Sequence, residues 1–176
     1  MKPAAFRYHA PKTIDEAVAT LAEVAPDDGR VLAGGQSLVP IMAFRLARPS
    51  HLVDINGIAG LDRIATANGK LSIGACVRHA AFYQPVVDGP LGRLLSTVVR
   101  HIGHHPIRTR GTFCGSLAHA DPASEWCMTA WRSWGVRINL MLCMKCLCTI
   151  HSMMLPSTMA KENETTRVFI APHFLG

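Results

Sequence analysis

The segment from Ile107 to Glu125, here named the downstream segment, constrains the fold most because its composition does not suit a core helix or strand. Its glycines, Gly111 and Gly115, leave the backbone uncovered, so a large ligand can lie against the main chain. Its other candidates for ligand contact are small, hydroxyl-bearing or acidic: Thr112, Ser116, Ala118, Asp121, Ser124 and Glu125. Backbone donors suit a diphosphate, and nearby carboxylates suit a ribose or ring N–H groups. A plain Gly/Ser turn between two elements is the alternative.

A second glycine-rich stretch, Leu32–Leu38, is here named the upstream segment. The residues Arg30–Ala33 predict a short buried strand, and Leu38–Leu46 predict a helix. A Gly-Gly turn between a strand and a helix can hold an anionic ligand through its free N–H groups. The turn lacks the Gly-x-Gly-x-x-Gly fingerprint, so it does not predict a nicotinamide site. An ordinary strand-to-helix turn is the alternative.

The first 57 residues predict a small unit of strands and helices. Phe6–His9 predicts a strand, and Thr13 with Glu16 forms the capping box of an amphipathic helix. Because the strand that ends at Ala33 follows that helix, the two strands are expected to form a parallel pair with a crossover. Leu52–Ile55 predicts a third strand.

From residue 58 the pattern changes to shorter elements. Leu61–Ala65 and Lys70–Gly74 predict two strands around Asn68-Gly69, a favoured hairpin turn. An apolar stripe from Leu91 to Ile102 predicts a helix. Cys76, between the hairpin and that helix, is expected to be a small buried residue.

The two glycine-rich segments together resemble those of a known family. Ala33-Gly34-Gly35-Gln36-Ser37 and the run Arg-Gly-Thr-x-x-Gly-Ser-Leu-Ala-His-Ala-Asp-Pro, which begins at Arg110, are similar in order and spacing to the FAD-binding medium subunits of molybdenum hydroxylases. Carbon monoxide dehydrogenase and the xanthine dehydrogenase family belong to this group. The resemblance covers residues 1 to about 130. It implies an α+β, two-lobed FAD-binding domain of the PCMH type. A small parallel βαβ lobe (1–57) precedes a mainly antiparallel lobe with helices (58–130, incomplete).

The resemblance implies that FAD lies between the two lobes, with the upstream segment against its diphosphate. It places Ile107 near the flavin, the glycines of the downstream segment on the phosphate and ribose side, and Glu125 near the ring system as an anchor. His119 either hydrogen-bonds the cofactor or is structural. The implied cofactor-binding residues are Leu32, Ala33, Gly34, Gly35, Gln36, Ser37, Leu38, Ile107, Gly111, Thr112, Gly115, Ser116, Ala118, His119, Asp121, Ser124 and Glu125.

The function that the resemblance implies is electron transfer by an FAD-dependent oxidoreductase subunit. In the family, a large molybdopterin subunit hydroxylates the substrate. A small subunit with two iron–sulfur clusters then passes electrons to the FAD, and onward to an acceptor. No catalytic side chain is expected here, because the flavin does the redox work. The alternatives are a truncated remnant with weak or no FAD binding, and a stand-alone flavin oxidase.

After Ala130 the resemblance ends, and residues 131–176 are predicted to be an atypical tail. A reading-frame shift in the gene is the favoured explanation. A zinc or iron–sulfur site is a second reading, since the tail contains Cys143, Cys146, Cys148 and His151. A membrane segment at 138–155 is a third, although a charged lysine within it would be costly.

Composition and charge exclude several other classes of protein and site. The chain has 176 residues, of which 49% are hydrophobic and 17% are charged, as in a globular protein. The net charge of +6 is not arranged as basic runs interleaved with aromatics, so nucleic-acid binding is not expected. No secretory signal opens the chain, which predicts a cytoplasmic protein with free thiols. The histidines 101, 104 and 105 have no carboxylate or thiol beside them, so no metal is expected there.

Overall fold

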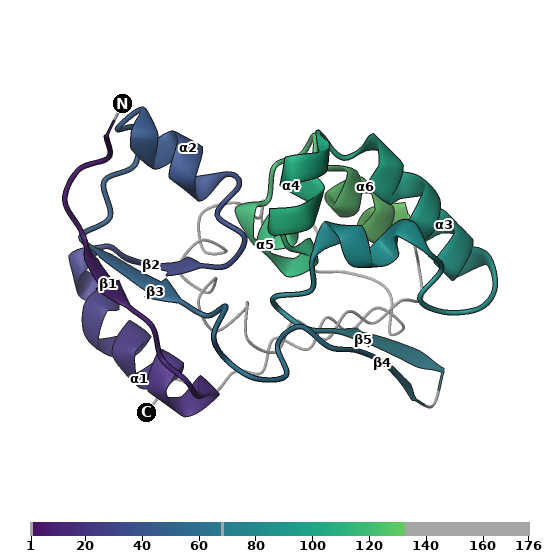
Figure 1. Ribbon diagram of the computed structural model, residues 1–176, viewed down its shortest axis with the longest axis horizontal. Helices are drawn as coiled ribbons and strands as arrows, with labels where there is room; N and C mark the ends of the chain where they lie inside the picture. Colours follow the sequence, from purple (N-terminus) through teal and green to yellow (C-terminus); the bar gives the residue numbers. More distant parts are fainter. Residues whose placement is uncertain (1, 68, 133–176) are drawn as a thin grey trace, which may run out of the picture.

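The computed structural model describes residues 2–67 and 69–132. Figure 1 shows two lobes side by side, joined by the chain that follows strand β3. The predicted tail lies outside the described residues from 133 onward, as do its cysteine cluster and candidate membrane segment.

The N-terminal lobe is a parallel three-stranded sheet with two helices. Its elements are β1 (Arg7–His9), α1 (Ile14–Val24), a 3-10 turn η1 (Ala25–Asp27), β2 (Gly29–Leu32), α2 (Leu38–Ala43) and β3 (His51–Asp54). The strand order is β1-β3-β2, so the parallel sheet is confirmed, but β1 and β2 do not pair directly. The hydrophobic strand takes the centre: Leu52 and Val53 of β3 are 3% and 0% exposed.

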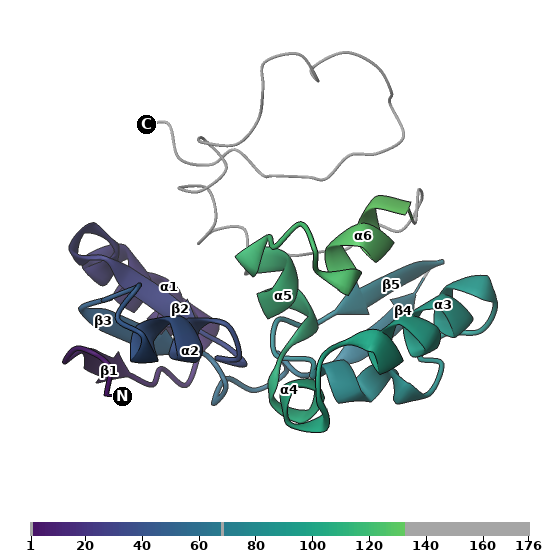
Figure 2. The ribbon, with the colours of Figure 1, turned by 90° about the horizontal axis from the view of Figure 1, so that it is seen from above.

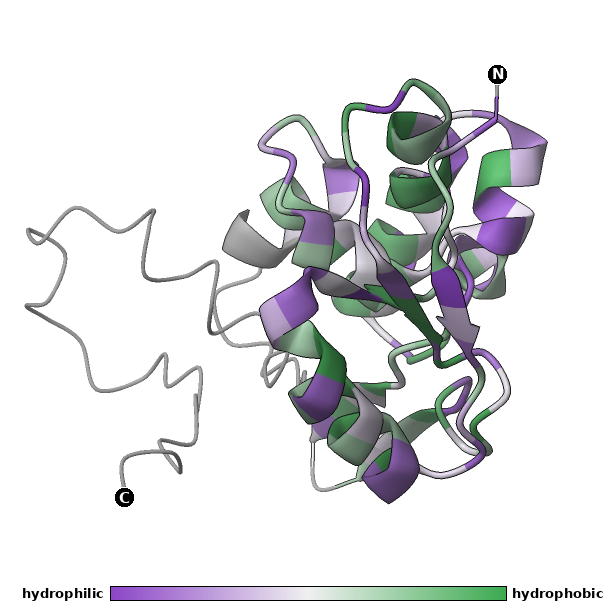
Figure 3. Cartoon of the chain, turned by 90° about the vertical axis from the view of Figure 1, so that its left-hand side faces the viewer, coloured by the Kyte–Doolittle hydropathy of each residue, from purple (hydrophilic) through white to green (hydrophobic). Residues whose placement is uncertain are grey.

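Helix α1 begins where the sequence predicts. The Thr13 hydroxyl accepts a hydrogen bond from the Glu16 N–H (3.2 Å), and the Glu16 carboxylate accepts one from the Thr13 N–H (3.3 Å). The buried residues of the helix are Ala17 and Val24, and Figure 3 shows both hydrophobic and hydrophilic colours along α1. The helix is therefore amphipathic, as expected.

Helix α2 is shorter than predicted. It ends at Ala43 rather than Leu46, and Arg45 has a left-handed φ of +57° that a continuing helix cannot contain. Leu46 is 80% exposed, so no burial favours a longer helix.

A small cluster fills the space between the sheet and the chain that leaves it. Ile55, Ile58, Leu61 and Cys76 pack there with Ala17 of α1. Cys76 is 4% exposed, which confirms its predicted burial. Residues on both sides of the predicted 57/58 lobe boundary share this cluster.

The second lobe contains one antiparallel hairpin and a set of short helices in its described part. Its elements are β4 (Ile64–Ala67), β5 (Lys70–Ile73), the 3-10 turns η2 (His79–Tyr83) and η3 (Val99–His101), and the helices α3 (Pro90–Val98), α4 (His105–Arg110), α5 (Phe113–His119) and α6 (Glu125–Arg132). The hairpin and the helix at α3 are confirmed. The first hairpin strand begins at Ile64 rather than Leu61. In Figures 1 and 2, α4 and α5 are the helices nearest the N-terminal lobe.

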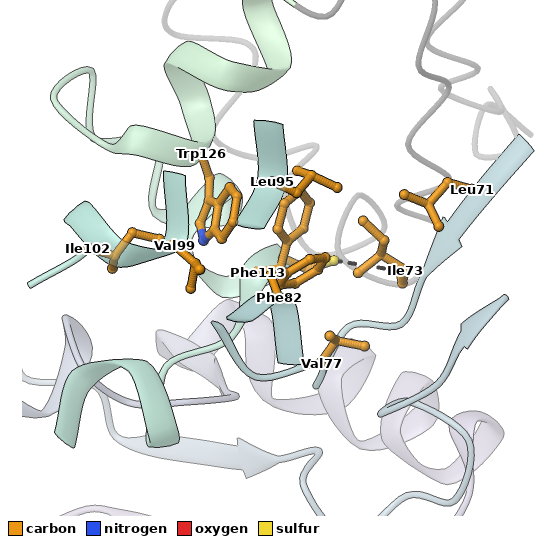
Figure 4. Close-up of a cluster of buried hydrophobic side chains, with 10 residues drawn as sticks. Leu71, Ile73, Val77, Phe82, Leu95, Val99, Ile102, Phe113 and Trp126 are labelled. Atoms are coloured by element: carbon orange, nitrogen blue, oxygen red, sulfur yellow. Dashed lines mark hydrogen bonds between the residues drawn. The ribbon is translucent and has the colours of Figure 1, made fainter. Parts of the chain in front are cut away.

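Three aromatic rings form the centre of the second lobe (Figure 4). Phe82, Phe113 and Trp126 are each at most 2% exposed. The ring centroids lie 5.3 Å apart for Phe82–Phe113, 5.2 Å for Phe82–Trp126 and 4.8 Å for Phe113–Trp126, all tilted. Such tilted contacts are favourable between aromatic rings.

The expectation that the downstream segment does not suit a core element is wrong for its centre. Phe113 and Cys114 begin α5, and both belong to the main hydrophobic cluster. A helix places successive side chains on different faces, so α5 buries these two residues while Gly115 lies beside the other lobe.

Candidate functional site

The two glycine-rich segments lie against each other where the lobes meet. A methyl group at Gly34 would lie 2.5 Å from the Arg110 carbonyl oxygen and 2.6 Å from the Gly111 Cα. One at Gly115 would lie 3.8 Å from the Cβ of Ala33. Since the upstream segment follows β2, this contact forms at the carboxyl end of the parallel sheet, where open α/β sheets bind ligands.

The upstream segment directs its carbonyls toward protein donors. Three consecutive carbonyls accept hydrogen bonds: Ala33 from the Asn56 side chain (2.7 Å), Gly34 from the Gln36 side chain (3.1 Å) and Gly35 from the Val39 N–H (3.0 Å). A trans peptide directs its N–H away from its carbonyl, so each bond also orients the following N–H.

The backbone N–H groups of this segment remain available. Within residues 2–67 and 69–132, the N–H groups of residues 34–37 donate to no protein acceptor. Gly35 has a φ of +70°, a conformation that favours glycine. Oriented N–H groups without protein partners are suited to the oxygens of a diphosphate.

The downstream segment is held by its own hydroxyls. Thr112 caps α5, because its Oγ1 accepts a hydrogen bond from the Gly115 N–H (3.1 Å). A methyl at Gly115 would lie 2.5 Å from this Oγ1, so a side chain at position 115 would shift the Thr112 side chain from its present geometry. The hydroxyls of Ser116 and Ser124 lie 2.7 Å apart and connect α5 to the start of α6.

The acidic end of the downstream segment shapes the turn between α5 and α6. The Asp121 carboxylate accepts the Ala123 N–H (2.9 Å), and its backbone carbonyl accepts the Ser124 N–H (2.9 Å). Asp121 and His119 are exposed, whereas Ala118 and Glu125 are half-buried. The Asp121 carboxylate therefore stabilises the turn that contains it.

A chain of polar side chains runs beside the contact between the segments. Tyr8 donates to Asp54, Asn56 donates to Asp54 (2.6 Å), and Arg78 donates to the Asn56 Oδ1 (2.7 Å) and to the Arg110 carbonyl. Burial of the Asp54 carboxylate acts to raise its pKa. Hydrogen bonds from Tyr8 and Asn56 and the charge of Arg78 outweigh burial and lower this pKa below its usual value. Asp54 is therefore ionised at neutral pH.

Behind Gly111 lies the buried side chain of His79. A methyl at Gly111 would lie 2.6 Å from the His79 Nε2, so this position also requires glycine. The Trp126 indole N–H donates to the His79 Nδ1 (2.8 Å). Burial, with the nearby charge of Arg78, lowers the pKa of His79 from 6.5 to about 4. His79 is therefore neutral and supports the downstream segment from inside its lobe.

The structure brings part of the predicted site together directly. Residues from both segments meet at the contact between the lobes: Ala33, Gly34, Arg110, Gly111 and Gly115. Leu32 ends β2, Ser37 and Leu38 begin α2, and Ile107 packs against the core of the second lobe. Among the described residues, no backbone hydrogen bond joins Ala118, His119, Asp121 or Glu125 to the upstream segment.

Three residues at the site were missed by sequence reasoning: Asn56, Arg78 and His79. Asn56 carries a signal, because a polar residue just after a parallel strand lies at the edge where ligands bind. The stretch Ile73-Gly74-Ala75-x-x-x-His79 also resembles the family. Arg78 carries no local signal, since both of its partners are distant in sequence.

The described part of the chain contains neither a cluster of three or more metal-ligating residues nor a helix able to span a membrane. No group of three or more His, Cys, Asp or Glu residues there is arranged to hold a metal ion. Among the same residues, no helix has both the length and the apolar character needed to cross a membrane.

Known proteins with similar sequences are subunits of oxidoreductases. The chain is 43% identical over 125 residues to the caffeine dehydrogenase subunit beta of Pseudomonas sp. (strain CBB1), which covers 71% of this chain and 42% of that protein. It is 40% identical over 126 residues to the carbon monoxide dehydrogenase medium chain of Hydrogenophaga pseudoflava, covering 71% and 43%. The chain thus spans less than half the length of these relatives.

Solved structures agree with the sequence comparison. Carbon monoxide dehydrogenase from Hydrogenophaga pseudoflava matches with a TM-score of 0.67 at 40% identity, over 72% of this chain and 44% of that one. Quinoline 2-oxidoreductase from Pseudomonas putida 86 matches with a TM-score of 0.63 at 43% identity, over 69% and 42%. These matches confirm the predicted two-lobed fold.

The family itself is identified by residues 4–141, which match the FAD binding domain in molybdopterin dehydrogenase. This match continues past Ala130, where the sequence resemblance was expected to end. FAD, implied by the family resemblance of the two glycine-rich segments, is the cofactor of this family. The chain therefore belongs to the FAD-binding domains of molybdopterin dehydrogenases.

Proposed function

We propose that this chain binds FAD between its lobes and serves as the electron-transfer domain of a molybdenum-containing hydroxylase. The observation that carries the proposal is the direct contact of Gly34 with Arg110 and Gly111, beside a row of N–H groups at residues 34–37 that have no protein acceptor in the described part. The contact brings the two segments together, and the N–H groups beside it suit the oxygens of a large anionic ligand. Membership of an FAD-binding family gives that ligand its identity.

Different residues would contact different parts of FAD. The N–H groups of the upstream segment would hold the diphosphate, with Gln36 fixing the loop through the Gly34 carbonyl. Leu32 and Leu38 would flank that loop. In the downstream segment, Ile107, Ser124 and Glu125 would lie near the flavin ring system. The other residues that would line the cofactor are Gly111, Thr112, Gly115, Ser116, Ala118, His119 and Asp121. No protein nucleophile or acid is required, because bound FAD supplies the redox chemistry by accepting and releasing electrons.

The partners proposed are a small iron–sulfur subunit and a large molybdopterin subunit. Relatives are named as subunits of enzymes for caffeine, nicotine and carbon monoxide, which range from nitrogen heterocycles to a diatomic gas. A shared FAD domain beside such different substrates is consistent with substrate choice on another subunit. The cytoplasmic location and the origin of the tail stay predictions from the sequence.

The test is FAD binding by the purified chain, measured by titration and by flavin absorbance that is released on denaturation. Gly34→Ala should weaken FAD affinity at least about tenfold, because a methyl 2.5 Å from the Arg110 oxygen separates the two segments. Gly57→Ala is the matched control. That added methyl would lie 3.5 Å from its nearest neighbour, the Lys12 Nζ, and affinity should not change.

The opposite result identifies the alternative. A colourless wild-type protein that does not bind added FAD would indicate a truncated remnant of the family. Equal FAD affinity of the two glycine variants would place the cofactor away from the contact between the segments. Flavin turnover by the isolated chain with a substrate would favour a stand-alone oxidase.

A further inference from the structure

We propose that Arg78 and Asn56 form a bridge that holds the two lobes in their cofactor-binding orientation before FAD arrives. The part of this inference that concerns affinity rests on the proposed FAD function. Neither side chain is a catalytic residue, since both act on the backbone of the glycine-rich segments and so position the binding site.

Arg78 lies where the chain passes from one hydrophobic cluster to the other. Cys76 packs in the cluster beside the N-terminal sheet, and Val77 packs in the core of the second lobe. A junction of this kind is where two lobes can rotate relative to each other. Beyond this junction, orientation depends on contacts such as those of Arg78.

The bridge connects the two glycine-rich segments through their carbonyls. Arg78 donates through Nη1 to the Arg110 carbonyl and through Nη2 to the Asn56 Oδ1 (2.7 Å). The Asn56 Nδ2 in turn donates to the Ala33 carbonyl (2.7 Å). Ala33 and Arg110 directly precede Gly34 and Gly111, so the bridge holds the two peptide groups that lead into the glycines in contact.

The chemistry of the bridge requires these residue types. A guanidinium is planar and donates in two directions at fixed geometry, whereas an ammonium is a single point of charge. A side-chain amide accepts at its oxygen and donates at its nitrogen, so Asn56 can pass the connection from Arg78 to Ala33. Asp54 accepts from the Asn56 side chain (2.6 Å) and N–H (2.9 Å), which fixes the amide orientation. Preorganisation of this kind lowers the entropic cost of binding.

The experiment uses the full chain and variants Arg78→Gln, Arg78→Lys, Asn56→Ala and the double variant Arg78→Gln/Asn56→Ala. Residual dipolar couplings of the FAD-free protein measure the relative orientation of the lobes, and titration measures FAD affinity. We expect one alignment tensor to describe both lobes of the wild type and separate tensors to be needed in each variant. FAD affinity should fall about 10- to 100-fold.

Two comparisons separate the bridge from simpler roles. Lysine should not restore affinity or orientation at position 78, and the double variant should bind FAD no more weakly than the worse single variant, because the two residues act as one unit. Arg100→Gln changes an exposed arginine and should match the wild type. Thermal unfolding of each FAD-free variant verifies that it folds.

Full rescue by lysine, additive losses in the double variant, or one unchanged tensor in Arg78→Gln would each overturn the bridge. If the wild type does not bind FAD, the proposed function fails. The dipolar couplings of the FAD-free chain then still decide for or against the bridge.

Discussion

His79 is neutral because burial and the nearby charge of Arg78 lower its pKa, and one hydrogen bond fixes its tautomer. An indole N–H can only donate, so the His79 Nδ1 that faces Trp126 carries no proton and the Nε2 carries it. Protonation would place a second N–H against the indole and a charge in a site that is 5% exposed. This ring lies against Gly111, so its charge state affects the downstream segment.

We expect the free energy of unfolding to decrease as the pH is lowered from 6.5 to about 4, because of His79. Below pH 6.5 the unfolded chain binds a proton at this residue, whereas the folded chain does not until about pH 4. Because the unfolded state binds more protons in that window, the free energy of unfolding decreases as pH falls, by at most about 1.4 kcal/mol per pH unit. Urea unfolding at a series of pH values measures this slope.

Two variants isolate the contribution of His79. His79→Gln should flatten the slope between pH 6.5 and 4, since glutamine does not titrate. His101→Gln, which changes an exposed histidine, is the matched control. Asp54 acts at lower pH: its lowered pKa gives stability that is lost only as pH falls through that pKa. A slope that persists unchanged in His79→Gln would assign the effect to other groups.

At the scale of elements, α1 owes its start to the capping box. Thr13→Ala removes the hydroxyl that accepts the Glu16 N–H and should lower the free energy of unfolding by about 1 kcal/mol. Thr13→Ser keeps an oxygen at the same place and should stay close to the wild type. Chemical unfolding of both variants measures the difference, and equal losses would show that packing rather than the cap sets the cost.

The elements that the sequence predicts correctly are those with local signals. The cap at Thr13 fixes the start of α1 through residues next to it in sequence. Gly69, with φ +70°, likewise allows the tight turn between β4 and β5. The central place of β3 was not predicted, because strand order depends on which strand is most completely buried. Helix α5 was missed because its glycine and serine, Gly115 and Ser116, favour a turn and lie next to the buried residues Phe113 and Cys114.

In the candidate site, too, the features with local sequence signals were predicted and those that depend on distant residues were not. Each glycine-rich segment is continuous in sequence, so its suitability for a diphosphate was predicted from its own residues, whereas the approach of the two segments was implied by the family resemblance. The connections around them are not local: Arg78 lies 22 residues from Asn56 and 32 from Arg110. No periodicity or motif relates such positions, so the bridge is visible only in three dimensions.

At the scale of the whole molecule, the buried hydrophobic side chains form two clusters, and the first includes residues on both sides of the 57/58 lobe boundary. One lies between α1 and the chain around Ile58, and the other surrounds the aromatic rings of the second lobe. Adjacent residues, Cys76 and Val77, belong to different clusters. The FAD site depends on both lobes, because each contributes one glycine-rich segment.

The stability of the second lobe depends on Trp126, which lies near the end of the described chain. This residue of α6 is 1% exposed, contacts both Phe82 and Phe113, and donates to His79. Its replacement by alanine opens a cavity in the aromatic centre and leaves His79 without its donor. Trp126→Ala should therefore cost about 3–5 kcal/mol, which is most of the stability of a typical small lobe.

The expected result is selective loss of one lobe. In Trp126→Ala, amide hydrogen exchange should become fast in α3 and α5 and remain slow in β3, whose Leu52 and Val53 are buried in the other lobe. FAD affinity should be lost, because the downstream segment is then no longer held by its lobe. Met128→Ala changes a 53% exposed residue on the same helix and should retain both protection and binding. Equal loss of protection in β3 would instead show that the two clusters unfold as one unit.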